Sequence, residues 1–272
     1  FINFIYYIGG KVELLTNGIG LTAVVFLPII SALVLTAIPK SQELLIKGFA
    51  LVSSIVTFVL SVLLLPQFDF SNADKLQLGN KITWIKSINA NYEIGIDGIS
   101  LPLLILSTFI TVLAIIYSIE HLPEPKSPKG FLALILVLET GMNGTFVALD
   151  LILFFVFFEI VLLPMYFMIG IWGDKTVRSV AGFKNQIETR LYASIKFFVF
   201  TLFGSAFMLL GFLGLYYRGN KTFSIPELIE LGTSGAFTGT FATLVFAVLF
   251  LGFAVKVPMW PLHTWLPDAH TA

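Results

Sequence analysis

Four ionisable side chains lie inside long apolar stretches of this sequence. They are Glu139, Glu159, Lys196 and Lys256. A charged side chain at the centre of a bilayer costs at least about 2.5 kcal/mol, so such residues face protein or water and mark ion or proton pathways. Carboxyl and amino groups also change charge when their surroundings change, so a row of them can pass protons on. The residue types therefore indicate proton or ion movement.

Glu159 is the least ambiguous of the four. Eight apolar residues, LILFFVFF, precede it and four follow it before Pro164. A span needs about 20 apolar residues, so this position lies near the middle of the membrane. The alternative is a protonated acid whose hydrogen bond to a neighbouring helix only holds the bundle together.

For Glu139 and Lys196 the sequence allows a structural explanation as well as a functional one. Glu139 shares its helix with Gly141, Asn143 and Gly144, and small residues at this spacing also form tight helix contacts. Lys196 lies near the start of its apolar run, where a long aliphatic stem can carry the ammonium to the membrane interface.

Lys256 stands just before two prolines in the stretch AVKVPMWPLHTWLPDAH. Proline has no N–H, so Pro258 is expected to free the carbonyl of Ala254, and Pro261 that of Val257. The sequence predicts a helix broken around Lys256. Unwound backbone at membrane depth occurs where protein or a water-filled cavity satisfies it, as in transporter ion sites. The alternative is a helix that ends at the interface with a snorkelling lysine.

The residues after the break include His263, Asp268 and His270. Their spacing does not put all three on one helical face, so we predict no metal site. A histidine with an ordinary pKa of about 6.5 is more naturally a proton carrier, and we assign that role to His263. The alternative for His263 is a hydrogen bond to a freed carbonyl. Trp260 and Trp265 fit an aromatic belt at the membrane interface.

Seven apolar runs are long enough to position these residues in a membrane. We expect spans near residues 19–38, 48–66, 99–119, 131–149, 151–172, 191–217 and 237–257. The runs are too long and too uniformly apolar for barrel strands, so all are predicted as helices. The predicted fold is an all-α integral membrane bundle with a broken seventh helix. It forms one transmembrane domain over residues 19–272, preceded by an extension over residues 1–18.

Composition supports the membrane class and excludes others. The chain is 57% hydrophobic and 12% charged, whereas soluble domains have about 25% charged residues. Its 16 basic and 16 acidic residues balance, so nucleic acid is not an expected partner. No cysteine is present and only three histidines are. Thiolate iron–sulfur clusters are therefore excluded and a bis-histidine haem is not favoured, so we expect no cofactor on this chain.

Three stretches carry a resemblance to a known family. They are ALDLILFFVFFEIVLLPMYFMIGIWG, YASIKFFVFTLFGSAFMLL and FAVKVPMWPLHTWLPDAHTA. Together they resemble subunit M, or subunit 4, of the proton-pumping NADH:quinone oxidoreductase, respiratory complex I. The resemblance covers most of residues 20–272 but neither the first eighteen residues nor the insert-like DKTVRSVAGFKNQIET.

The resemblance implies a bundle of about fourteen helices in two inverted repeats, of which this chain would be the N-terminal half. It implies that Glu159 and Lys256 form the central ion pair of a proton channel, with Lys196 and Glu139 as further relay groups. The partners would be other membrane-arm subunits and the lipid bilayer of an energy-transducing membrane, most naturally a bacterial plasma membrane. Quinone reduction in other subunits would drive proton movement here.

Two other functions stay open at this point. The first is a subunit of a multisubunit cation/proton antiporter or of a membrane-bound hydrogenase, built on the same Glu–Lys pair. The second is a structural or assembly subunit of the membrane in which the charges only hold helices together.

Overall fold

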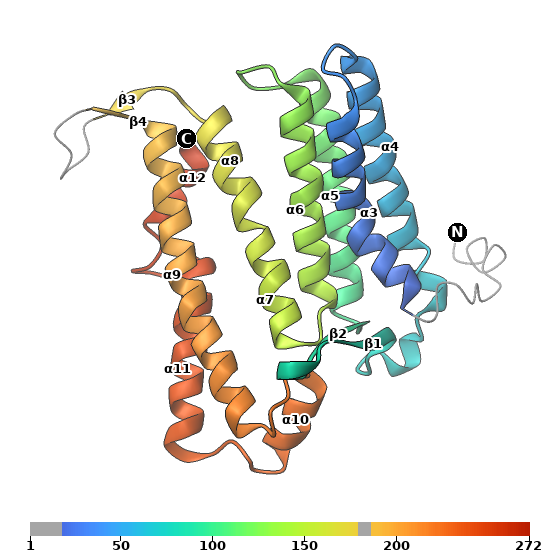
Figure 1. Cartoon of the computed structure of the whole chain (residues 1–272), viewed down its shortest axis with the longest axis vertical. Coiled ribbons are helices and arrows are strands. Elements are labelled where there is room, and N and C mark those ends of the chain that lie inside the picture. The colour runs from blue at the N-terminus through green and yellow to red at the C-terminus, as the bar shows by residue number, and fades with distance from the viewer. Residues whose placement is uncertain (1–17, 179–185) are drawn as a thin grey trace. The chain divides into compact units, whose positions relative to one another are not determined.

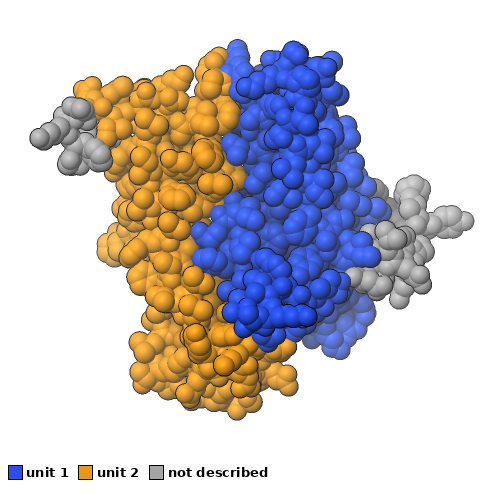
Figure 2. Space-filling model, viewed as in Figure 1, with its two compact units in different colours: residues 1–122, 126–161 blue, residues 123–125, 162–272 orange. Residues whose placement is uncertain are grey.

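The computed structural model describes residues 18–178 and 186–272, which fold into two compact units (Figures 1 and 2). Unit 1 comprises residues 1–122 and 126–161, and unit 2 comprises residues 123–125 and 162–272. Residues 1–17 of the predicted extension and part of the insert-like stretch lie outside the described residues.

Unit 1 is a helix bundle with a β-hairpin. Its helices are α3 (Ile19–Ala37), α4 (Glu43–Val62), α5 (Ser100–Glu120), α6 (Pro128–Val147) and α7 (Leu151–Ile160). Its short 3-10 helices are η1 (Leu65–Gln67), η2 (Phe70–Asn72) and η3 (Lys86–Ile88), and its strands are β1 (Gln77–Ile85) and β2 (Ala90–Ile96). Helix α6 packs against α3, α4, α5 and α7 (Figure 1).

Unit 2 is built around one long helix. Its elements are α8 (Leu162–Trp172), β3 (Val177–Arg178), β4 (Ile187–Glu188), α9 (Thr189–Arg218), α10 (Ile225–Thr233), α11 (Gly239–Lys256) and α12 (Trp265–Thr271). Helix α9 packs against α8, α11 and α12. It therefore lies beside both halves of the segment in which the sequence predicts a break.

The seven predicted spans are confirmed. Within the described residues, seven helical segments are long and apolar enough to cross a membrane, and they coincide with the predicted runs to within a few residues. The fifth of them, Leu151–Trp172, consists of α7 and α8 with an interruption at Val161. The chain is an integral membrane protein with an all-α membrane region.

The spans of unit 1 bury small polar side chains and expose large apolar ones. Ser54, Thr57, Ser61 and Thr108 are fully buried, and the hydroxyls of Ser61 and Thr108 join α4 to α5 at 2.8 Å. Large exposed apolar side chains on α3, α4 and α5 include Leu33, Val52, Val56, Leu106 and Ile110. Lipid is as apolar as leucine, so membrane helices associate through small and hydrogen-bonding residues.

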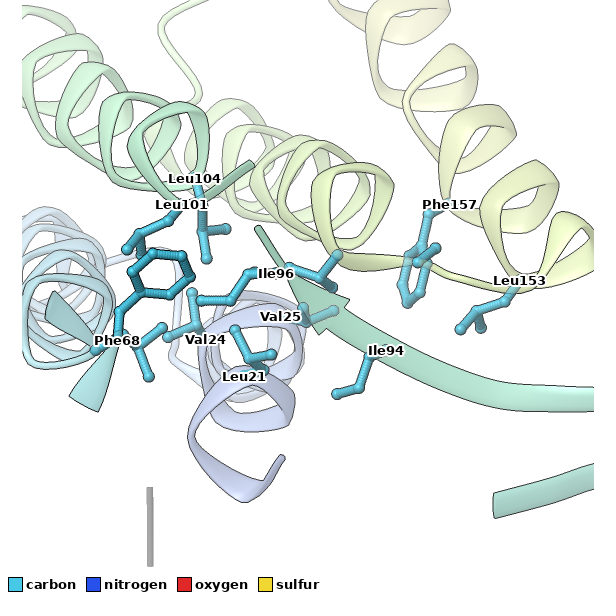
Figure 3. Packing of buried hydrophobic residues seen from close by; sticks show 13 residues of the cluster. Leu21, Val24, Val25, Phe68, Ile94, Ile96, Leu101, Leu104, Leu153 and Phe157 are labelled. Atoms are coloured by element: carbon cyan, nitrogen blue, oxygen red, sulfur yellow. The ribbon is translucent and has the colours of Figure 1, made fainter. Parts of the chain in front are cut away.

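An apolar core lies where the hairpin meets the ends of the unit 1 helices (Figure 3). Its buried side chains include Leu21, Val24, Val25, Phe68, Ile94, Ile96, Leu101, Leu104, Leu153 and Phe157. Strand β2 is almost entirely buried while β1 is largely exposed. The hairpin lies between the predicted spans near 48–66 and 99–119 and was not predicted from the sequence.

Asp150 fastens the hairpin to the start of α7. Its carboxylate accepts hydrogen bonds from the backbone N–H groups of Ile152 at 2.9 Å and Leu153 at 3.2 Å, which caps the helix. It also accepts the N–H of Asn91 in β2 at 2.9 Å. Burial raises the pKa of Asp150, although these three N–H donors and the Lys81 ammonium act in the opposite direction.

Candidate functional site

The predicted helix break at Lys256 is present. Helix α11 ends at Lys256, residues 257–264 form turns, and α12 begins at Trp265. Pro258 and Pro261 lie in these turns. Lys256 is partly buried at the last position of α11.

The prediction that Pro258 frees the carbonyl of Ala254 was wrong. This carbonyl accepts the backbone N–H of Met259 at 2.9 Å. Proline removes the donor that a regular helix would supply, but the chain turns so that the donor one residue further on takes its place. The expectation for the carbonyl of Val257 stays a prediction.

Trp265 was wrongly predicted to belong to an aromatic belt. It is only 6% exposed, and its indole N–H donates to the carbonyl of Val255 at 2.8 Å. A buried indole N–H needs an acceptor, and a carbonyl at the broken helix end is available for it. Trp260, in contrast, is 84% exposed, as an interfacial residue would be. The hydrogen bond of Trp265 thus attaches α12 to the last turn of α11 across the break.

Lys196 has an ionic partner that the sequence analysis did not assign to it. Its ammonium donates to a carboxylate oxygen of Asp268 at 2.7 Å, which joins α9 to α12. The lysine and aspartate side chains are 20% and 17% exposed. The ammonium therefore points toward α12, and whether Lys196 also lies at the membrane interface stays a prediction.

An apolar hollow of about 270 Å³ borders Lys196. Its lining includes Tyr192, Ile195, Val199 and Phe200 of α9. The Lys196 ammonium also lies 5.6 Å from the centre of the Tyr192 ring, within the range of a cation–π contact. The ammonium thus contacts both the Asp268 carboxylate and the Tyr192 ring.

His263 lies in the turns between α11 and α12. Its Nδ1 atom is buried and has no hydrogen-bond partner among the described residues. The alternative for His263, a hydrogen bond to a freed carbonyl, is therefore not made through Nδ1. His270, in the last turn of α12, is exposed. Over residues 18–178 and 186–272, no group of three or more His, Asp or Glu side chains could hold a metal ion.

Glu159 lies in the last turn of α7, two residues before the interruption at Val161, and is partly buried. The sequence analysis did not predict this interruption. The signal for it was Pro164, which cannot donate to the carbonyl of Ile160 as a helical residue would. Glu159 belongs to unit 1 and Lys256 to unit 2, and their pairing stays a prediction.

Glu139 is completely buried in α6. Neither of its carboxyl oxygens has a hydrogen-bond partner within the part of the chain that the structure describes. The tight helix contact considered as its alternative does exist nearby, because Gly141 and Gly144 leave no room for a side chain against Val161 and Phe157. This contact accounts for the glycines but gives the carboxyl group no partner.

The structure thus brings together some of the predicted residues and adds others. Lys196, Lys256 and His263 all lie along α9 and the broken α11–α12 segment of unit 2, whereas Glu139 and Glu159 lie on adjacent helices of unit 1. Asp268 was considered only as a metal ligand. The i,i+3 spacing of Trp265 and Asp268, which puts both on one face of a helix, was the signal that could have pointed to its contact with α9.

Comparisons with known families match nearly the whole described chain. Residues 23–145 match the family described as "NADH-ubiquinone oxidoreductase chain 4, amino terminus". Residues 148–192 and 183–272 match the family described as "NADH:quinone oxidoreductase/Mrp antiporter, TM".

Individual relatives give the same result. The chain is 38% identical over 252 residues to the NAD(P)H-quinone oxidoreductase chain 4 of Gloeobacter violaceus, which covers 92% of this chain and 43% of that protein. It is 39% identical over 263 residues to the NADH-quinone oxidoreductase subunit M of Rhodobacter capsulatus, with 92% and 48% covered. A chain of respiratory complex I from Thermus thermophilus with bound NADH matches with a TM-score of 0.73 and 26% identity, over 92% of this chain and 46% of that one. This chain therefore spans less than half the length of these relatives.

Proposed function

Because the chain belongs to the family of NADH-quinone oxidoreductase subunit M, also called chain 4, we propose that it is a proton-translocating part of that oxidoreductase. It couples quinone reduction, carried out by other subunits, to proton movement through Glu159, Lys256, Lys196, Glu139 and His263. Its partners are the other membrane-arm subunits, and its site is an energy-transducing membrane, in a bacterium the plasma membrane. NADH, flavin and quinone bind elsewhere in the complex, and this chain carries no redox centre.

The observation that carries the proposal is the discontinuous helix α11–α12 with a lysine at its broken end. Discontinuous helices with an ionisable residue at the break are the usual ion sites of transporters. A lysine in an apolar span that served only packing would be replaced without loss by an apolar residue, because its charge is costly there.

The proposed mechanism rests on the electrostatics of buried ion pairs. A carboxylate next to a buried ammonium stabilises its charge. When the carboxylate is neutralised or moves away, the ammonium loses this stabilisation and releases its proton to the next group along the route. Glu159 is the carboxylate that we assign to Lys256, and Asp268 stands in the same relation to Lys196 at 2.7 Å. Proton movement then follows the making and breaking of ion pairs.

The variant Glu159→Gln tests this function. Glutamine keeps the size and polarity of the side chain but cannot carry a negative charge. We expect the complex to assemble and to oxidise its electron donor with an artificial acceptor at the normal rate, while proton uptake into inverted membrane vesicles is strongly impaired. Glu43→Gln, at an exposed position of α4, is the matched control and should pump normally. Unchanged pumping by Glu159→Gln would refute the proposed role, and loss of assembly would favour the structural subunit.

A cation/proton antiporter subunit is the second candidate, since one matching family description also names the Mrp antiporter. The two functions differ in their driving force. Proton uptake that requires electron transfer to quinone indicates the oxidoreductase. Exchange of protons for sodium in vesicles without any electron donor indicates the antiporter.

A further inference from the structure

Two residues on one face of helix α12 contact α9. Trp265 and Asp268 are separated by one helical turn, so their side chains emerge on the same side of α12. Trp265 packs its ring on that of Phe197 in α9, with 5.3 Å between ring centres. Asp268 accepts a hydrogen bond from Lys196, the residue before Phe197. Two consecutive residues of α9 therefore hold α12.

One of these two residues, Trp265, also connects α12 to the break. The indole N–H of Trp265 donates to the carbonyl of Val255, the residue before Lys256. Around this contact, Leu162, Ile169, Ala193, Phe197 and Trp265 form a buried apolar cluster of unit 2. A displacement of α12 therefore also displaces the backbone next to Lys256, because a packed cluster does not deform gradually.

The attraction between Lys196 and Asp268 depends on whether the lysine is protonated. With Lys196 protonated, opposite charges hold α9 and α12 together at 2.7 Å. Both side chains are mostly withdrawn from water, so the attraction is stronger than that of a surface pair. After the ammonium has passed its proton on, only a neutral amine faces the carboxylate and most of the attraction is lost.

We propose that Asp268 is a positioning residue of the proton route, which couples the charge of Lys196 to the position of α12 and so to the helix break at Lys256. This inference rests on the proposed function. Protonated Lys196 holds α12 against α9, and the Trp265 bond then fixes the backbone beside Lys256. Deprotonation of Lys196 releases α12 and changes the surroundings of Lys256, so the two lysines do not change charge independently.

The experiment compares variants in the assembled oxidoreductase, in inverted membrane vesicles. Proton uptake per electron pair and the rate of quinone reduction are measured for Asp268→Asn and Asp268→Glu, with Glu159→Gln as reference. Glu188→Gln is the matched control, because it breaks an ion pair of the same 2.7 Å length, to Arg190, in the same unit but outside the break.

We expect Asp268→Asn to reduce quinone at the normal rate but to lose most of its proton uptake. Asp268→Glu should regain it, because the carboxylate is restored, whereas a side chain needed only for shape would tolerate the isosteric asparagine better than the longer glutamate. Glu188→Gln should pump normally. Normal pumping by Asp268→Asn while Glu159→Gln fails would overturn this inference alone. Normal pumping by both variants would overturn the proposed function as well.

A second variant covers the case in which Asp268→Asn does not assemble. Removal of one partner of a buried pair leaves an uncompensated charge, whereas removal of both does not. Lys196→Gln combined with Asp268→Asn should therefore assemble, and it should pump no less than Lys196→Gln alone, because Asp268 acts through Lys196. Normal pumping by the double variant, or its failure to assemble, means that the pair is only structural and the inference is wrong.

Discussion

At the scale of the residue, the two backbone carbonyl groups that directly precede Lys256 both accept hydrogen bonds. The carbonyl of Ala254 is taken by Met259 and that of Val255 by Trp265. The Ala254 carbonyl is thus already engaged, which weakens the idea that freed carbonyls alone stabilise the ammonium. We expect an ionic partner to supply the larger part of this stabilisation, so that the charge of Lys256 follows the state of that partner.

Replacement of Lys256 by arginine separates a relay from a static charge. Arginine keeps the positive charge but does not release its proton in proteins. Lys256→Arg should therefore leave assembly intact and lose most of the proton uptake per electron pair in vesicles. The control is Lys40→Arg, at an exposed position between α3 and α4, which should behave as wild type. A normal proton uptake per electron pair in Lys256→Arg would show that Lys256 has only a structural or snorkelling role.

At the scale of the element, the start of α7 depends on a single buried carboxylate. Asp150 caps the helix that carries Glu159 and at the same time bonds Asn91 in β2. The backbone bond from Leu149 N–H to the carbonyl of Glu93, at 2.8 Å, supports the same junction. The hairpin is thus hydrogen-bonded to the start of α7.

Two substitutions of Asp150 should separate its two roles. Serine is a good helix cap but does not reach Asn91, whereas alanine removes both interactions. We expect Asp150→Ala to destabilise the protein by about 1–3 kcal/mol, and Asp150→Ser by less. The unfolding midpoint is measured for the complex in detergent. It should be highest for the wild type, lower for Asp150→Ser and lowest for Asp150→Ala. Equal midpoints for serine and alanine would show that the cap contributes nothing.

At the scale of the whole molecule, the helices differ in how much of their surface the chain itself covers. In the apolar membrane-crossing part of each helix, 56% of the residues of α6 are buried but only 17% of those of α11. Leu244, Phe246 and Phe250 of α11 are among the exposed large apolar residues. The relatives are about twice as long as this chain, and in inverted-repeat folds a second repeat faces the first.

The 272-residue chain by itself should therefore insert into membranes without conducting protons. In inverted-repeat transporters the two repeats together form the ion route, and the relatives are about twice as long as these 272 residues. Proton flux is measured in liposomes that contain only this chain, with protein-free liposomes as the baseline. A flux above the baseline that Lys256→Ala abolishes would contradict the prediction.

The membrane spans were predictable because their signal is local. An apolar run of span length predicts a helix whatever surrounds it, and all seven runs became helices. The break at Lys256 was predictable for the same reason, since proline acts on the carbonyl four residues before it. The interruption at Val161 carried the same kind of signal in Pro164, but a proline with apolar neighbours does not by itself tell a continuous span from an interrupted one.

The sequence by itself determined the class of the protein, the positions of its spans and the residues whose charges demand an explanation, because hydropathy and proline act over a few residues. Only the tertiary structure decided which groups meet. Lys196 and Asp268 are 72 residues apart, and neither periodicity nor composition relates them. The same holds for Asp150 with Asn91 and for the buried indole of Trp265. Hydrogen bonds and ion pairs have a short range and a strict geometry, so their partners are set by the packing of helices far apart in the chain.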